Sequence, residues 1–207
     1  MALGKGGVVS SSPIPAATDP WLMLLWLLLL WLLLLLFSAR SRFVCSSLSG
    51  GSYLLQIKDR HNGNIMMSRN GSVIQIDFGF LLSNSPGGNM NFEAAPFKLT
   101  AEFVEIMGGE DSEHFAYFQL LVIRGYLEAR KHAHKFLLLV EILSQESKMA
   151  CWAGGVEASL AALRERFHLD WSEEQCVEHA YAIIEQSINN WRTVQYDRYQ
   201  QITNGIS

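Results

Sequence analysis

The sequence has few cysteines and no surplus of positive charge, and each shortage excludes a class of protein. Three cysteines occur in 207 residues, an odd number without the spacing of a metal site. This argues against a disulfide scaffold or a zinc module and favours a reduced, cytosolic compartment. The formal net charge of −4 offers no basic footprint for nucleic acid. Histidine pairs with HExxH spacing are also missing, so several histidines are interpreted as surface or internally hydrogen-bonded residues. They are His132, His134, His168 and His179.

The N-terminal part of the chain combines a low-complexity stretch with one long apolar run. Residues 1–20 are rich in Gly, Ser and Pro and are predicted to be disordered. Residues 21–37 carry no charge and would span about 26 Å as a helix, slightly less than a hydrocarbon core of about 30 Å. A membrane anchor, a signal peptide, and a low-complexity extension or gene-model artefact are the alternatives for this run. Residues 38–52 follow as a predicted Ser/Arg/Gly linker, whose Arg40 and Arg42 weakly favour a cytosolic side for the rest of the chain.

Residues 59–79, DRHNGNIMMSRNGSVIQIDFG, contain two polar clusters separated by a β-hairpin pattern. Asn70-Gly71 predicts a two-residue turn, because both residues tolerate positive φ, and this turn would set the register of the hairpin. Side chains alternate between the two faces of a strand, so the apolar pairs would share one face and Asn64 would lie opposite Asp77 on the other. The apolar pairs are Ile65 with Ile76 and Met67 with Ile74.

Asn64 and Asp77 form the candidate metal site. Paired across the hairpin, their Cβ atoms would be roughly 5 Å apart. An amide oxygen and a carboxylate at that separation can hold one Mg²⁺ ion, which prefers oxygen ligands. An ordinary hairpin with polar turns is the alternative, but Asp, His and Asn clustered at both ends would serve no packing purpose.

After the hairpin, apolar residues recur at helical spacing and capping residues precede several of the runs. Ser172 is followed by two glutamates, which complement a helix dipole. The predicted fold class is mostly α with a small β-hairpin. The expected helices are 100–107, 111–127, 131–144, 156–166, 172–190 and 191–206, with a loop at 144–155. In the last helix, the expected core residues are Trp191, Val194, Tyr199 and Ile202.

Several longer motifs accompany the hairpin: YLLQIKDRHNGNIM, IDFGFLLSNSPGGN, FEAAPFKLTAEFVEIMGG and TNGI. Over residues 53–207 the chain resembles the phosphatidylinositol 3-/4-kinase superfamily, and within it the class III beta-type phosphatidylinositol 4-kinases. The resemblance implies a protein-kinase-like C-terminal lobe that transfers the γ-phosphate of ATP to phosphatidylinositol, giving phosphatidylinositol 4-phosphate. The small N-terminal lobe of such kinases, with its Gly-rich phosphate loop and strand lysine, has no counterpart before Asp59. The isolated chain is therefore expected to be weak or inactive.

In these lipid kinases DRHNxN is the catalytic loop and DFG is the metal-binding motif. The resemblance therefore implies that Asn64 and Asp77 bind Mg²⁺ or Mn²⁺ against the ATP phosphates. Phe78 and Gly79 would complete the part of the site that faces this cofactor.

The other residues of the DRHN motif would act on the acceptor hydroxyl. His61 has the residue type of a general base near neutral pH, and Asp59 would orient it or share the proton. Arg60 belongs to the same catalytic motif. The interpretation favoured for Arg60, however, is a buried ion pair that supports the loop.

The segment after Gly79 resembles an activation loop, and residues 78–97 contain no Lys or Arg. Superfamily members that accept phosphorylated inositol rings bind them with basic residues in this loop. We therefore expect phosphatidylinositol with an unphosphorylated ring, the alternative being a neutral surface loop without this role. The resemblance also implies small GTPases and adaptor proteins as partners, no nucleic acid, and a location on the cytoplasmic face of Golgi membranes.

Two other functions stay open. A protein Ser/Thr kinase of the phosphatidylinositol-kinase-like group shares the same catalytic loop. A non-catalytic interaction module is the second alternative, because half of the nucleotide site is missing from the sequence.

Overall fold

The computed structural model of the chain describes residues 44–69, 73–86, 94–145 and 147–206. The predicted disordered segment 1–20 and the apolar run 21–37 lie outside these residues, so both stay predictions. Among the helices of the described part, none combines the length and the apolar content that a membrane span needs.

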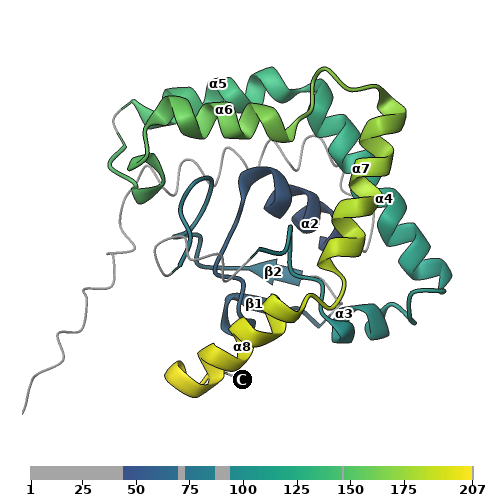
Figure 1. Cartoon of the computed structure of the whole chain (residues 1–207). Coiled ribbons are helices and arrows are strands. Elements are labelled where there is room, and N and C mark those ends of the chain that lie inside the picture. Colours follow the sequence, from purple (N-terminus) through teal and green to yellow (C-terminus); the bar gives the residue numbers. More distant parts are fainter. Residues whose placement is uncertain (1–43, 70–72, 87–93, 146, 207) are drawn as a thin grey trace, which may run out of the picture.

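The described part is mostly helical with one two-stranded antiparallel sheet, which confirms the predicted fold class (Figure 1). Every expected helix has a counterpart. The helices are α2 (Val44–Leu55), α3 (Ala101–Ile106), α4 (Glu113–Lys131), α5 (Ala133–Ser144), α6 (Val156–Arg166), α7 (Glu173–Ser187) and α8 (Trp191–Asn204). Two short 3-10 helices, η1 (Asn62–Asn64) and η2 (Ala150–Trp152), and the strands β1 (Ile65–Met67) and β2 (Val73–Gln75) complete the fold.

Capping side chains begin two of the long helices. At the start of α4, the Ser112 hydroxyl accepts a hydrogen bond from the backbone N–H of Phe115 at 3.0 Å. At the start of α7, Ser172 and Gln175 bond each other's backbone N–H groups in a reciprocal capping box. Both contacts satisfy N–H groups that have no partner within the helix.

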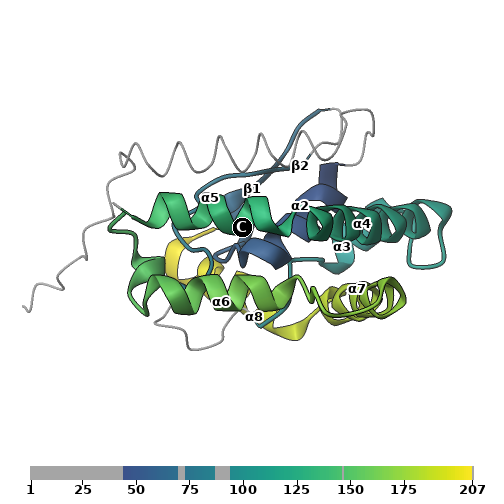
Figure 2. The same cartoon turned by 90° about the horizontal axis from the view of Figure 1, so that it is seen from above.

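The helices pack in pairs around two apolar clusters. Helix α5 lies along α6, α4 lies along α7, and α2 packs against both α4 and α6 (Figures 1 and 2). Both clusters are almost completely removed from water, so their apolar burial drives the packing of the whole domain. The fully buried side chains include Phe136, Leu163 and Phe167 in the first cluster and Leu99, Phe118 and Ile184 in the second.

Helix α2 begins inside the segment predicted to be a linker, so that prediction is wrong over residues 44–52. Ser and Gly are weak helix formers, and the pattern offered little local support for a helix. The packing of α2 on α4 and α6 overrides this weak propensity. Ser52, Leu54 and Leu55 are buried, the two leucines in the first apolar cluster. A helix therefore leads directly into the polar loop that starts at Asp59.

The hairpin forms with a register one residue away from the predicted one. Ile65 pairs with Gln75, Met66 with Ile74 and Met67 with Val73. The predicted turn at Asn70-Gly71 lies outside the described residues, but a register shift by one residue moves side chains to the opposite face. The predicted apolar face is wrong, because Met67 shares its face with buried Val73 while Ile74 lies on the other face.

The expected core residues of α8 are also wrong. Trp191 and Ile202 are 66% and 77% exposed, and Val194 and Tyr199 are exposed as well. The buried residues of α8 are Tyr196 and Gln200. The helix thus contacts the rest of the chain through a polar strip, which a search for apolar spacing does not detect.

A cluster of aromatic and imidazole rings joins α2 to α7. His168 stacks on Trp171, with ring centroids 3.9 Å apart, and His179 shares a 2.9 Å hydrogen bond with the Tyr53 hydroxyl. The side chain of Arg130 donates to the backbone carbonyls of His168 and Trp171 and fixes the loop after α6. Burial lowers the pKa of both histidines, and in His179 the neighbouring His168 lowers it further.

The lowered histidine pKa values predict a loss of stability in mild acid. The unfolded chain binds protons more readily at these positions, so the stabilisation is complete above the ordinary pKa of about 6.5 and is lost as the pH falls below it. We expect the free energy of unfolding in urea to fall between about pH 7.5 and pH 5.5, and to fall less in a His179→Gln variant. His134→Gln, at an exposed position, is the control and should keep the full dependence. Equal slopes in both variants would contradict this assignment.

Candidate active site

Two strained backbone positions mark the polar cluster at the base of the hairpin. Asp59 and Asp77 have φ angles of 63° and 54°, in the left-handed region that L-residues seldom adopt. Asp59 starts the DRHN loop, residues 59–64, and Asp77 starts the DFG turn, residues 77–79. Backbone strain of this kind persists where surrounding contacts hold it, and it often occurs at functional sites.

Asn64 closes the DRHN loop on itself. Its amide nitrogen donates to the backbone carbonyl of Asp59 at 2.9 Å and lies 3.5 Å from the Asp59 carboxylate oxygen Oδ2. The backbone carbonyl of Asn64 accepts a hydrogen bond from the backbone N–H of Ile76 at 3.0 Å. The predicted pairing of Asn64 with Asp77 is therefore wrong by one residue. Asn64 instead bonds the residue that precedes Asp77, which still brings the end of the loop to the start of the DFG turn.

Arg60 links the DRHN loop to the DFG turn. Its guanidinium donates to the carbonyl of Lys58 at 2.9 Å, to the carbonyl of Ile76 at 2.8 Å, and to the carbonyl of Asp77. The guanidinium carbon lies 5.3 Å from the centre of the Phe78 ring. The side chain is only 3% exposed, so these contacts compensate for the water that a buried charge loses. Arg60 thus supports the loop through hydrogen bonds to backbone carbonyls, and the favoured interpretation of a buried ion pair stays a prediction.

His61 and Asp59 lie next to each other within the loop. The imidazole Nε2 is 3.7 Å from Asp59 Oδ1, and the ring is almost fully buried. Its other nitrogen, Nδ1, is buried without a hydrogen-bond partner among the described residues. An unpaired polar atom in a buried position costs about 1–3 kcal/mol, so it points to a role beyond stability.

Helix α8 and Lys98 contact the loop, and the sequence patterns did not reveal these contacts. The Tyr196 hydroxyl donates to Asp59 Oδ1 at 2.5 Å. The Lys98 ammonium donates to Asn62 Oδ1 at 2.7 Å and to Asp197 at 2.6 Å. Asp59 and Tyr196 are 137 residues apart in the chain, so no local sequence pattern connects them. The spacing of polar residues along α8 is the one signal that could have indicated such contacts.

Asn64 and Asp77 each carry a side-chain oxygen, the ligand type of a hard divalent cation, but with the register shifted by one residue they no longer face each other across the strands, so the metal site stays a prediction. Asp77 is exposed, and its Oδ1 accepts the backbone N–H of Gly79 at 3.3 Å, which orients the carboxylate. The side-chain nitrogen of Asn64 bonds Asp59, so its amide oxygen is the atom that would bind a cation. Nowhere in the described ranges do three or more His, Cys, Asp or Glu side chains converge as metal ligands. A site with two protein oxygens suits Mg²⁺, which keeps several waters and usually binds substrate phosphates.

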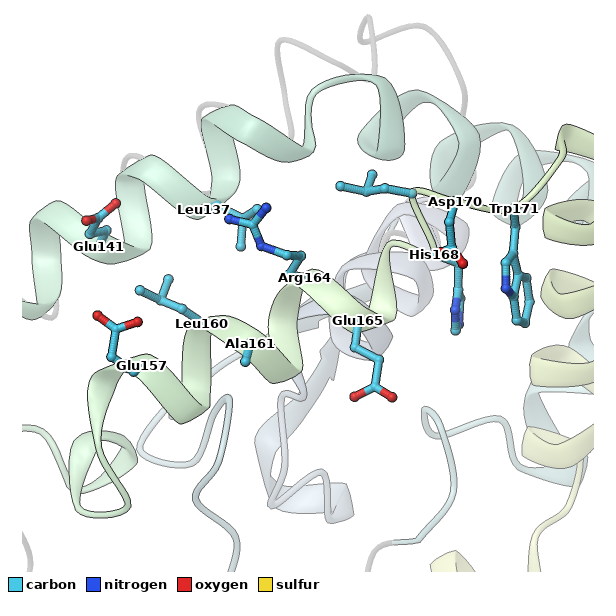
Figure 3. A pocket seen from close by; sticks show the side chains of 11 residues that line it. Leu137, Glu141, Glu157, Leu160, Ala161, Arg164, Glu165, His168, Asp170 and Trp171 are labelled. Atoms are coloured by element: carbon cyan, nitrogen blue, oxygen red, sulfur yellow. The ribbon is translucent and has the colours of Figure 1, made fainter.

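A cavity of about 830 Å³ lies elsewhere, between α5, α6 and the loop that follows α6 (Figure 3). Glu141 and Glu157 line one end, and His168 and Trp171 line the other. None of the predicted site residues lines it. The candidate active site at the base of the hairpin is therefore separate from this cavity.

Helices that carry a polar loop, a hairpin and a DFG turn have the organisation of a kinase-like C-terminal lobe. The family model "Phosphatidylinositol 3- and 4-kinase" matches residues 34–153. The chain belongs to the phosphatidylinositol 3- and 4-kinase family, which confirms the resemblance seen in the motifs.

Known relatives give the same result and are much longer. The chain is 52% identical over 177 residues to phosphatidylinositol 4-kinase beta 2 of Arabidopsis thaliana, covering 82% of this chain and 16% of the relative. It is 48% identical over 171 residues to phosphatidylinositol 4-kinase of Dictyostelium discoideum, covering 82% of this chain and 14% of the relative. With phosphatidylinositol 4-kinase beta of Bos taurus, identity is 44% over 171 residues, covering 82% of this chain and 21% of the relative. The chain thus spans about a fifth or less of their lengths.

Gly63 allows His61 to lie close to the loop backbone, and this contact can be tested. A Cβ atom at Gly63 would lie 3.0 Å from Ile206 Cγ2 and 3.2 Å from the His61 ring. We expect Gly63→Ala to lower the free energy of unfolding by about 1–3 kcal/mol, the usual cost of overpacking.

The matched control is Gly50→Ala in α2, where no atom lies within 4 Å of the added carbon. This change should be neutral or should stabilise the helix by about 0.5–1 kcal/mol. Chemical denaturation of both variants measures the difference. Equal stabilities would mean that the DRHN loop moves aside without cost.

Proposed function

We propose that residues 53–206 form the catalytic C-terminal lobe of a 1-phosphatidylinositol 4-kinase that uses ATP and a divalent cation. The observation that carries the proposal is the linkage of the DRHN loop to the DFG turn through Arg60 and Asn64. This linkage ties the loop that carries the His61–Asp59 pair and Asn64 to the turn that carries Asp77. The relatives named as phosphatidylinositol 4-kinases support the lipid substrate and the 4-position.

The reaction needs a hydroxyl proton to leave while a phosphoryl group arrives. The oxygen of the inositol 4-hydroxyl forms a bond to the γ-phosphorus of ATP, the bond to the bridging β–γ oxygen breaks, and ADP leaves. His61 accepts the hydroxyl proton, and the neighbouring Asp59 carboxylate stabilises the resulting imidazolium. Asn64 and Asp77 are the residues that would hold Mg²⁺, and a bound Mg²⁺ would neutralise charge on the phosphates. Arg60 fixes the spacing between the DRHN loop and the DFG turn.

The neutral loop after the DFG turn supports phosphatidylinositol as the lipid. Residues 78–97 have no Lys or Arg, and residues 87–93 of this loop lie outside the described part. The first cation after the loop, Lys98, is 4% exposed and engages Asp197 and Asn62. A phosphate on the inositol ring would therefore gain little from Lys98, so an unphosphorylated ring is the favoured substrate.

The cellular setting follows from the lipid substrate. We expect the kinase to act on the cytoplasmic face of a membrane, with the Golgi as the site implied by the resemblance. Small GTPases and adaptor proteins are the partners implied in the same way. The apolar run 21–37 would provide an additional anchor if it is a membrane segment.

The overall proposal can be tested with a hybrid kinase in which residues 53–206 replace the matching segment of the Arabidopsis relative. Phosphatidylinositol vesicles, Mg²⁺ and labelled ATP should yield phosphatidylinositol 4-phosphate, whereas the 207-residue chain alone should show little turnover. Labelling of peptides in place of the lipid would identify a protein kinase. A stable hybrid without either product would favour an interaction module.

Loss of the Asp77 carboxylate should abolish most of the activity of the hybrid. We expect Asp77→Ala to lower kcat by at least about a hundredfold, because the metal loses its charged ligand. Asp77→Asn tolerates the left-handed backbone and keeps an amide oxygen, so it separates the loss of charge from backbone strain. Asp170→Ala, at an exposed position beside the α5–α6 cavity, is the control and should keep normal turnover. Normal turnover in Asp77→Ala would reject the metal assignment.

Adding positive charge to the loop should change lipid preference. We expect Asn89→Lys together with Asn91→Lys to strengthen binding to vesicles that contain phosphatidylinositol bisphosphate by about 1 kcal/mol or more per charge-assisted contact. Ala158→Lys with Ala161→Lys, at exposed positions of α6, adds the same charge elsewhere. Vesicle flotation compares the two variants. Equal gains, or a parent hybrid that prefers the bisphosphate, would reject the argument from the neutral loop.

A further inference from the structure

Helix α8 reaches the proposed active site through the buried side chain of Tyr196. In Figure 1 this helix lies below the hairpin, near β1. The Tyr196 hydroxyl donates to Asp59 Oδ1 at 2.5 Å, across a separation of 137 residues in the chain. The ring of Tyr196 also lies 6.4 Å from the ring of His61. One tyrosine thus contacts both residues to which the proton transfer is assigned.

The direction of the Tyr196 proton is determined by its other neighbour. Gln200, one turn further along α8, donates its amide N–H to the phenol oxygen at 2.9 Å. The amide oxygen of Gln200 in turn accepts from the side chain of Asn204. A phenol has one proton to donate, and its oxygen already accepts from Gln200, so the proton is directed to Asp59. The chain of donors therefore runs from Asn204 through Gln200 and Tyr196 to the carboxylate.

A second contact keeps α8 in position. Asp197 follows Tyr196 and holds the Lys98 ammonium at 2.6 Å, and Lys98 donates to Asn62 at 2.7 Å. Neighbouring residues of one helix thus contact the DRHN loop at its first residue and, through Lys98, near its end. Because the Lys98 side chain is only 4% exposed, solvent competes little for this contact.

We propose that Tyr196 is a positioning residue that holds the Asp59 carboxylate toward His61. The inference rests on the proposed function for the role of the pair, and on the structure for the contact. Asp59 Oδ1 accepts the hydrogen bond from the phenol, and the same oxygen lies 3.7 Å from His61 Nε2. Without the phenol, the carboxylate loses the 2.5 Å donor at Oδ1, and the 3.5 Å contact of Asn64 with Oδ2 holds its rotation less firmly. A tyrosine that served packing alone would tolerate replacement by phenylalanine, because the ring would be kept.

The first test uses the 207-residue chain and needs no activity. Hydrogen exchange of the backbone amides of residues 58–64 reports how firmly the DRHN loop is held. Tyr196→Phe should speed exchange in this loop by about tenfold while leaving α4 and α7 unchanged. Tyr199→Phe, at an exposed position of the same helix, is the matched control and should match the parent chain. Unchanged exchange in Tyr196→Phe would overturn the proposal.

The second test measures kinetics in the hybrid kinase. Tyr196→Phe should lower kcat by about ten- to a hundredfold, as small misplacements of reacting groups do, with the KM for ATP nearly unchanged. Tyr199→Phe should keep the parent values. If Tyr196→Phe does not fold, Gln200→Leu removes the donor to the phenol and should produce a smaller fall of the same kind. A rise in KM with unchanged kcat would reject the positioning role.

A double-variant cycle identifies the residue through which Tyr196 acts. In an Asp59→Asn background, Tyr196→Phe should have almost no further effect on kcat, because the group it positions has changed. Independent, multiplying effects would show that Tyr196 does not act through Asp59. An inactive parent hybrid would reject the proposed function, and the exchange experiment would then still decide whether Tyr196 holds the loop.

Discussion

The buried guanidinium of Arg60 is the constraint on which the candidate site depends. Backbone carbonyls on both sides of the site replace the water that a full positive charge with this little exposure has lost. Each carbonyl must lie within hydrogen-bond reach, so the DRHN loop and the DFG turn cannot move independently. A lysine could not replace this planar fork, because an ammonium group concentrates its charge at one point and lacks the fixed geometry of the guanidinium.

The strained aspartates and the polar contacts of α8 follow from the same constraint. Asp59 and Asp77 adopt left-handed backbone angles, and Arg60 bonds the backbone carbonyl of Asp77, which helps to hold that strained turn. Tyr196 then fixes a side chain whose backbone is already held. The helical core beneath supplies the rigid base, since its clusters are almost entirely apolar and closely packed. Stability and chemistry are thus separated between the core and the loops.

Much of the fold could be predicted from the sequence, because most of its helices carry strong local signals. Helix α6 begins and ends at the expected residues, and Ser172 caps α7 as its pattern indicated. The errors occur where distant contacts decide the outcome. Helix α2 forms in a Ser/Gly-rich segment because it packs on α4, and strands β1 and β2 pair in a register that the Asn-Gly signal did not predict. At the site, motifs identified the polar residues of the loop and the turn, whereas Tyr196 is brought there by tertiary structure alone.

The contact between Ile206 and Gly63 has a practical consequence for handling the protein. Ile206 lies against the glycine that lets His61 pack over the loop, so the last described residue of the chain borders the candidate site. An affinity tag, fluorophore or fusion partner joined after this point would begin beside His61 and could press on the DRHN loop. Labels and purification handles are better placed away from this end, for example at exposed positions of α6, so that their bulk stays clear of the hairpin.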